Sequence, residues 1–190
     1  MKGRIGLSVF LVTFFVVTIG AFYEASADHH GRKKRWRHQR RDRNHSEDYE
    51  KGTLKPVNNL TYKEKCGACH FAYQPELLPS RSWQKILSRL EDHFGDAVEI
   101  DHESKKVIAG YLESCAAEHS SAKRAVKIMR CLGNETPLRI TEIPYIQKKH
   151  YEISPKILER ESIGSLSNCI ACHKTAEKGI YDDDHVSIPK

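Results

Sequence analysis

Two copies of the pattern Cys-x-x-Cys-His constrain this chain more than any other feature. They read Cys66-Gly67-Ala68-Cys69-His70 and Cys169-Ile170-Ala171-Cys172-His173. The pattern is the attachment signature of c-type haem. Two thiols on one helical turn reach the two vinyl groups on one porphyrin edge, and the adjacent His turns its imidazole under the iron. We therefore expect four cysteines to bind two haems covalently, with His70 and His173 as the proximal ligands.

A zinc site and a redox dithiol are the alternative interpretations of such motifs. Zinc sites with this spacing usually belong to reducing, cytosolic surroundings. A thioredoxin-like dithiol needs a βαβ context, which the apolar pattern of this chain does not provide. Two complete motifs together favour haem over both alternatives.

The N-terminus has the features of a secretory signal peptide. A short basic start is followed by an apolar run over residues 5–22 and by the small-residue site Ala25-Ser26-Ala27. Residues 1–27 are therefore expected to direct export to a periplasm or to the outer face of a bacterial membrane. The apolar run is close to bilayer-spanning length, so an uncleaved anchor is the alternative.

Residues 28–52 form a basic arm with nine Lys/Arg, five Asp/Glu and four His. The arm has no periodic apolar residues, and its composition predicts disorder. It is interpreted either as a solvated tether or as a contact for a membrane surface or an acidic partner; export excludes nucleic acid as a partner. The rest of the chain, residues 53–190, has 20 Lys/Arg and 19 Asp/Glu, so most of the excess positive charge lies in the arm.

Apolar spacing over residues 53–190 predicts a mainly α fold: a compact helical domain with irregular loops, packed around its haems. No long run alternates with period two, so a sheet is not expected. Expected helices are one capped by Ser80 or Ser82 and ended by Gly95, one capped by Asp101, one over residues 121–132, one from Pro144 and one opened by Ser154-Pro155. Residues 139–143 are expected to be extended.

Methionine is too scarce for both irons to have a Met ligand, because Met129 is the only one beyond the initiator. Two bis-His haems fit this composition better. His93 and His150 fall on the apolar sides of their predicted helices and are the expected distal ligands; the alternative is that they are hydrogen-bonded core histidines. Proximity in the chain pairs His93 with His70 and His150 with His173, and a crossed pairing is the alternative.

Three further histidines outside the arm are weaker candidates. His119 follows Cys115 by four residues and Leu112 by seven, which makes it the reserve axial ligand. His102 lies off the apolar stripe of its helix, and His185 follows three Asp residues, so both are expected to be exposed.

Two cysteines, Cys115 and Cys131, remain outside the motifs. In an oxidising compartment an even remainder suggests a disulfide, which would close a loop of about 16 residues and contribute roughly 3 kcal/mol. Two free buried thiols are the alternative.

The chain resembles the small bacterial dihaem cytochrome c family. The matching stretches include Trp83, His150, both haem motifs and residues 65–79, 92–95, 108–117, 139–142 and 176–179. The resemblance implies an exported protein with low-spin bis-His haems and an electron-transfer role, and it supports His93 and His150 as distal ligands. Cys115 and Cys131 depart from the family pattern, so it does not support their disulfide.

These features favour an electron-transfer protein over an enzyme, because the chain has no convincing catalytic triad or carboxylate pair. The expected partners are other redox proteins, either c-type cytochromes or a membrane electron donor. One alternative is a peroxidase-like dihaem enzyme with one open haem site. Another is a haem subunit of a membrane-associated redox complex.

Overall fold

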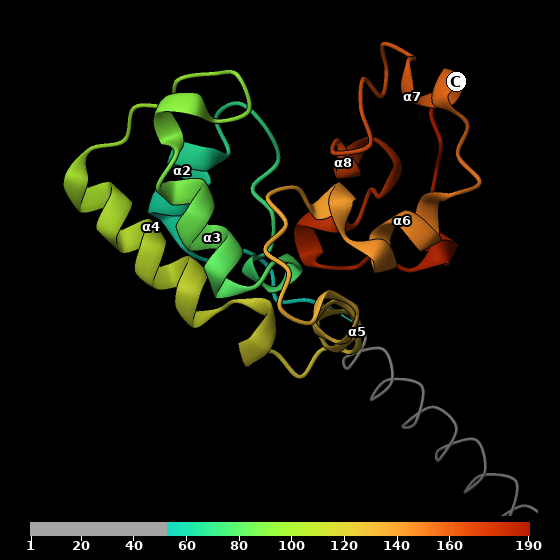
Figure 1. Ribbon diagram of the computed structural model, residues 1–190. Coiled ribbons are helices and arrows are strands. Elements are labelled where there is room, and N and C mark those ends of the chain that lie inside the picture. The colour runs from blue at the N-terminus through green and yellow to red at the C-terminus, as the bar shows by residue number, and fades with distance from the viewer. Residues whose placement is uncertain (1–52) are drawn as a thin grey trace, which may run out of the picture. The chain divides into compact units, whose positions relative to one another are not determined.

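Helices and irregular loops make up residues 53–190, which are the residues that the computed structural model describes (Figure 1). The predicted signal peptide and basic arm lie outside this range. Within it no strand is formed, which confirms the mainly α prediction. None of the helices in this range is long and apolar enough to span a bilayer. The α-helices are α2 (Leu60–Cys66), α3 (Ser80–Leu87), α4 (His102–Ser114), α5 (Lys123–Leu132), α6 (Pro144–His150), α7 (Pro155–Leu158) and α8 (Cys169–Cys172).

Helix α4 is the longest helix of the N-terminal half, and it packs against α3 and α2 (Figure 1). Its predicted cap is confirmed, because the Asp101 carboxylate accepts a 2.8 Å hydrogen bond from the Ser104 N–H. A side chain in this position satisfies an N–H group that has no partner within the helix. Ile108 and Leu112 on the inner face are 0% and 1% exposed, as their spacing predicts.

The predicted helix over residues 80–95 is wrong in both its cap and its length. Pro79 is the N-cap, and α3 already ends at Leu87. A short 3-10 turn, Leu90–Asp92, follows, and the chain then reverses at Phe94 and Gly95, whose φ angles are +61° and +105°. Left-handed residues cannot continue a right-handed helix. His93 therefore lies in a tight turn instead of on a helix face.

The C-terminal half follows the sequence more closely. Helix α5 ends at Gly133, which has a φ of +52°, and Pro144 and Pro155 open α6 and α7 as expected. Proline suits this position because its missing N–H has no partner in the first helical turn. Residues 139–143 are not extended: Ile140–Glu142 form a 3-10 turn, in which the Glu142 carboxylate accepts a hydrogen bond from the Arg139 N–H.

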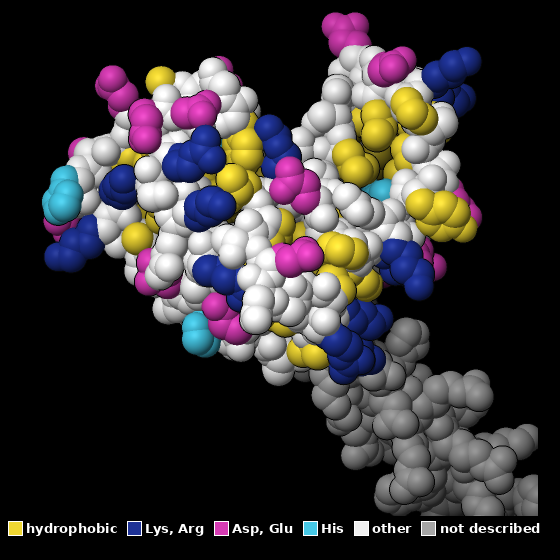
Figure 2. Space-filling model, viewed as in Figure 1, with side chains coloured by type: hydrophobic (Ala, Val, Ile, Leu, Met, Phe, Trp, Pro, Cys, Tyr) yellow, Lys and Arg dark blue, Asp and Glu magenta, His cyan; other side chains and the backbone are white. Residues whose placement is uncertain are grey.

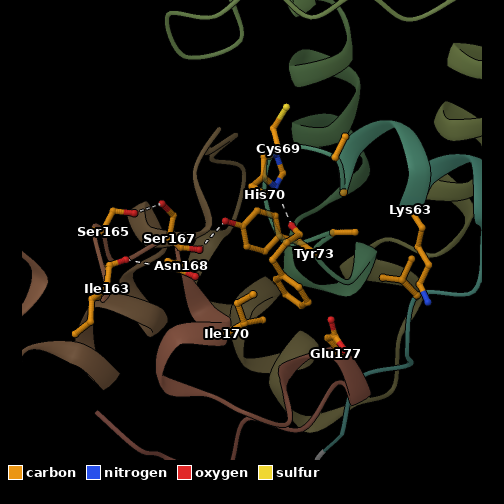
Figure 3. Close-up of a pocket in the computed structure, with 16 residues that line it drawn as sticks. Lys63, Cys69, His70, Tyr73, Ile163, Ser165, Ser167, Asn168, Ile170 and Glu177 are labelled. Carbon is orange, nitrogen blue, oxygen red and sulfur yellow. Dashed lines mark hydrogen bonds between the residues drawn. The ribbon is translucent and has the colours of Figure 1, made fainter. Parts of the chain in front are cut away.

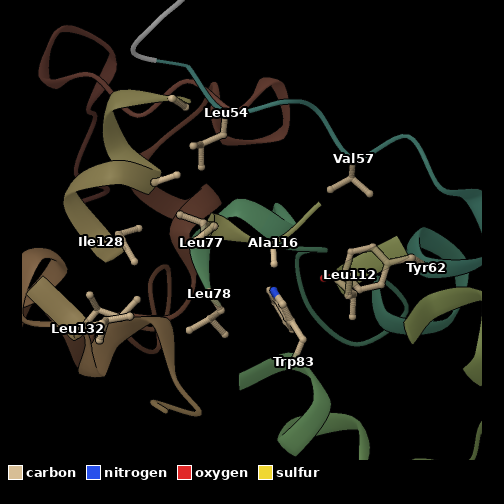
Figure 4. Packing of buried hydrophobic residues seen from close by; sticks show 14 of the residues in the cluster. Leu54, Val57, Tyr62, Leu77, Leu78, Trp83, Leu112, Ala116, Ile128 and Leu132 are labelled. Atoms are coloured by element: carbon tan, nitrogen blue, oxygen red, sulfur yellow. The ribbon is translucent and has the colours of Figure 1, made fainter. Parts of the chain in front are cut away.

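Buried side chains from both halves form one apolar core, part of which is drawn in Figure 4. Trp83 lies within it and donates a 2.8 Å indole hydrogen bond to the Pro75 carbonyl. The buried carboxylate of Glu76 accepts hydrogen bonds from the Lys55 N–H and the Ser120 hydroxyl. Buried polar groups are stable only with such partners. The core members are Leu54, Val57, Tyr62, Leu77, Leu78, Trp83, Leu87, Leu90, Ile108, Leu112, Ala116, Ala117, Ala122, Ala125, Ile128, Leu132, Ile143 and Ile146.

Replacing Ile108 by Ala is expected to lower the free energy of unfolding by about 2–5 kcal/mol, because the change leaves a cavity in a fully buried site. Its neighbour Val107 is 40% exposed, and Val107→Ala should change the free energy of unfolding by no more than about 0.5 kcal/mol. Guanidinium unfolding of the haem-loaded protein, followed by far-UV circular dichroism, measures both. Equal losses for the two variants would contradict the burial of Ile108.

Candidate haem-binding sites

The first motif lies at the end of α2. Cys66 is the last residue of the helix, and Gly67 is its C-cap. Only glycine fits there, since a Cβ atom at Gly67 would lie 2.2 Å from the Lys63 carbonyl oxygen. The chain then turns through the exposed residues Cys69 and His70. The His70 Nδ1–H donates a 2.8 Å hydrogen bond to the Phe71 carbonyl, which leaves Nε2 free to bind a metal.

His93 lies against His70, although 23 residues separate them in the chain. Their ring centroids are 6.2 Å apart, and the ring planes differ by only 13°. His93 is held in place by two backbone hydrogen bonds that it exchanges with Asp96 across the tight turn. Burial and the nearby His70 lower the pKa of His93. Its imidazole is therefore neutral at pH 7, as a metal ligand must be.

The second motif forms the short helix α8, and His173 follows it directly. His150, the last residue of α6 and the expected distal ligand, lies near His173: the two ring centroids are 6.0 Å apart, with 74° between the ring planes. The His150 Nδ1–H donates a 2.8 Å hydrogen bond to the Ile146 carbonyl, so its Nε2 is also free. Burial, His150 and Arg124 lower the pKa of His173.

The separations of both pairs fit a shared metal ion. Imidazole nitrogens bind transition metals at about 2 Å, so two rings on opposite sides of one metal ion have centroids roughly 6 Å apart. The structure brings together His70 with His93 and His150 with His173. These are the pairs suggested by proximity in the chain, not the crossed ones. The side chains therefore fit two iron centres, each with a ligand on both sides.

The remaining histidine candidates lie elsewhere. His119, the reserve ligand, is an exposed residue at the end of the 3-10 turn Ala117–His119, and among the described residues no ring contact joins it to either motif. His102 is exposed at the start of α4, and His185 is exposed and pairs with Asp182. The expected exposure of His102 and His185 is thus confirmed.

A cavity of about 870 Å³ lies between the first motif and the segment that precedes the second (Figure 3). Its volume is near the upper end of the usual range for small-molecule sites, about 300–1,000 Å³. Cys69, His70 and Tyr73 line it from one side, and Asn168 and Ile170 line it from the other. Part of both motifs therefore faces one space.

Three residues that the sequence interpretation missed connect the two sites. The Gln74 side chain is fully buried; its amide donates a 2.6 Å hydrogen bond to the Ala176 carbonyl and accepts one from the Tyr181 hydroxyl. The Tyr73 hydroxyl donates to the Ser167 carbonyl at 2.7 Å (Figure 3). The Tyr73 ring lies 5.3 Å from the His70 ring, and the Tyr181 ring lies 5.4 Å from the His173 ring. The three hydrogen bonds join residues that are 94 to 107 positions apart in the chain, and no local pattern predicts them.

The cysteines inside the motifs and those outside them differ in their surroundings. Burial raises the pKa of the Cys66 and Cys169 thiols to about 11, so both are neutral thiols at pH 7 in the haem-free chain. The predicted Cys115–Cys131 disulfide is not formed, and both are free cysteines. Cys131 is exposed and donates to the Ile128 carbonyl of its own helix, while the Cys115 sulfur lies 3.8 Å from the Ser114 hydroxyl. Each sulfur thus contacts its own local segment.

Comparison with known proteins gives the family. The model of the dihaem cytochrome c family matches residues 62–181. A diheme cytochrome c of known structure from Rhodobacter sphaeroides is 41% identical to this chain, with a TM-score of 0.60. The match covers 68% of this chain and 99% of the Rhodobacter chain. A diheme cytochrome c from Shewanella baltica OS155 is 36% identical, with a TM-score of 0.56. The match covers 69% of this chain and 93% of the Shewanella chain. No curated protein matches the chain. This chain therefore belongs to the dihaem cytochrome c family and carries two covalently attached haem c groups, as its two motifs predict.

Proposed function

We propose that this protein is an exported electron carrier whose two haems are each bound by two histidines. The observation that supports the proposal most directly is the pairing of His70 with His93 and of His150 with His173 at about 6 Å. Haem iron, when bound, supplies one-electron chemistry by alternating between its ferric and ferrous states. Histidines on both sides leave no open position for peroxide or another substrate, so electron transfer suits this arrangement better than catalysis.

The surrounding carbonyls limit how far the ligands can move. The hydrogen bonds from His70 to Phe71 and from His150 to Ile146 each fix one ring tautomer and the ring orientation. A ligand that keeps its orientation in both oxidation states reduces the rearrangement that accompanies electron transfer. The local structure thus supports repeated one-electron cycling.

Other redox proteins are the proposed partners, either c-type cytochromes or a membrane electron donor. Acidic and basic side chains are interspersed on the face of the domain shown in Figure 2. Residues 53–190 have nearly balanced charge, so we propose that the basic arm, residues 28–52, adds the main electrostatic contact with a membrane surface or an acidic partner. Localisation in the periplasm or on the outer face of the membrane follows from the proposed signal peptide, residues 1–27.

Electron paramagnetic resonance of the ferric protein is expected to give two low-spin signals of different shape. When the two ligand planes are parallel, both ligands interact with the same one of the two iron dπ orbitals, and the energies of the two orbitals separate. When the planes are perpendicular, each ligand interacts with a different orbital, and the two orbitals stay nearly equal in energy. The 13° pair should therefore give a rhombic signal, and the 74° pair a signal with a large maximal g value. A high-spin signal, or rapid turnover of peroxide, would contradict the proposal and favour the peroxidase-like alternative.

Removing a distal ligand should open one iron and leave the other unchanged. His93→Ala should abolish the rhombic signal and allow carbon monoxide to bind one ferrous haem, while His150→Ala should do the same for the other signal. The matched control is His119→Ala, which removes an exposed histidine outside both pairs and should leave both signals intact. If His119→Ala opened a haem and His93→Ala did not, the assignment of the distal ligands would be wrong.

A further inference from the structure

Arg124 places a cation beside the second haem site. Its side chain extends from α5, donates a 2.8 Å hydrogen bond from Nη2 to the Tyr181 carbonyl, and lies 5.3 Å over the Tyr181 ring. That ring in turn packs edge-on against His173. The Arg124 Nε–H is buried and finds no acceptor among residues 53–190. The guanidinium is therefore held in a defined position close to the proximal ligand.

The two carboxylates near this site each have a partner, and both are at least partly exposed to water, which screens their charge. Asp183 and Asp182 are the carboxylates that act on His173, and they raise the pKa of its imidazole, against the effects of burial and Arg124. Asp182 pairs with His185, and Asp183 pairs with the Lys149 ammonium at 3.6 Å. Arg124 forms no ion pair with any residue that the structure describes. Its positive charge is therefore unpaired and half-buried beside His173, and it contributes to the lowered pKa of that imidazole.

The first site has a different electrostatic environment. Arg139 lies 4.0 Å over the Phe94 ring, beside His93, but it is exposed and its guanidinium is 3.9 Å from the Glu142 carboxylate. Arg139 also contributes to the lowered pKa of His93, but an exposed, paired charge acts weakly because water screens it. Moreover, His70 donates its Nδ1–H to a carbonyl, which makes it a stronger electron donor to iron, whereas the buried His173 Nδ1 has no acceptor among the described residues.

We propose that the C-terminal haem, bound by His150 and His173, has the higher reduction potential of the two, and that Arg124 raises it. This inference rests on the proposed function, because it needs two six-coordinate haems. Ferric iron carries one more positive charge than ferrous iron, so a nearby cation without an ion-pair partner destabilises the ferric state relative to the ferrous state. If the haem-loaded protein held a single electron, that electron would reside mainly on the iron of the His173 site, which would be ferrous, and the iron of the His70 site would be ferric. No bond and no proton is involved.

Redox titration of the haem-loaded wild-type protein, followed by electron paramagnetic resonance, tests the order of the potentials. As the potential is lowered, the signal with the large maximal g value should disappear before the rhombic one. The reverse order would overturn this inference while leaving the proposed function intact. Absence of one or both low-spin signals in the fully oxidised protein would instead overturn the proposed function.

Substitution of Arg124 tests the cause. Arg124→Gln should shift the ferric–ferrous equilibrium of the C-terminal haem about tenfold toward ferric, which is the order expected for one charge roughly 10 Å away at an effective dielectric constant near 20. A tenfold shift corresponds to ~59 mV for one electron. The rhombic signal should not move, and Arg124→Lys, which keeps the charge, should retain most of the wild-type potential.

The matched control is Arg130→Gln, which removes the same charge from an exposed position on the same helix and should shift neither potential. If Arg124→Gln left the C-terminal potential unchanged, or if Arg130→Gln lowered it equally, Arg124 would not be its determinant. If the Arg124→Gln variant does not load haem, the Arg124→Lys variant and the wild-type titration still test the proposal. A tenfold shift of the ferric–ferrous equilibrium in Arg124→Lys, which keeps the charge, would contradict the role of charge.

Discussion

The buried amide of Gln74 is the contact on which the arrangement of both haem sites depends. It follows the first motif by four residues, yet its hydrogen-bond partners, the Ala176 carbonyl and the Tyr181 hydroxyl, both lie shortly after the second motif. An amide in an apolar interior is stable only when its donor and acceptor are both satisfied. Gln74 therefore holds the C-terminal segment against the N-terminal half in one register. His173 and its neighbour Tyr181 are positioned as a consequence.

Much of the site could be predicted from the sequence because its chemistry is local. The spacing of Cys and His in each motif specifies the cofactor, and the scarcity of methionine directs attention to His93 and His150. The proline-led start of α6 could be recognised from one residue, Pro144, and it brings His150 to the end of that helix. A few neighbouring residues carry the information for the motifs and for the start of α6, whereas the methionine count is a property of the whole chain.

What the sequence did not reveal depends on long-range contacts or on the backbone. The apolar spacing from Trp83 to Phe94 is helical, but α3 ends at Leu87 and is followed by a 3-10 turn and a tight turn with positive φ angles. That turn, and not a helix face, presents His93 to His70. The hydrogen bonds of Gln74, Tyr73 and Tyr181 join segments far apart in the chain, so no local pattern indicates them. Cysteine parity likewise suggested a disulfide, although Cys131 and Cys115 each contact their own segments.

The different backbone settings of the two distal histidines also explain why the sites are not equivalent. His93 follows a 3-10 turn and is held by Asp96, so its ring lies almost parallel to that of His70. His150 ends a helix, where its bond to the Ile146 carbonyl turns the ring across that of His173. With the proposed bis-His coordination, identical ligand types would produce two electronic environments, and the proposed effect of Arg124 would add a difference in charge. Two haems of unequal potential give the electron a preferred site, which two equivalent haems would not provide.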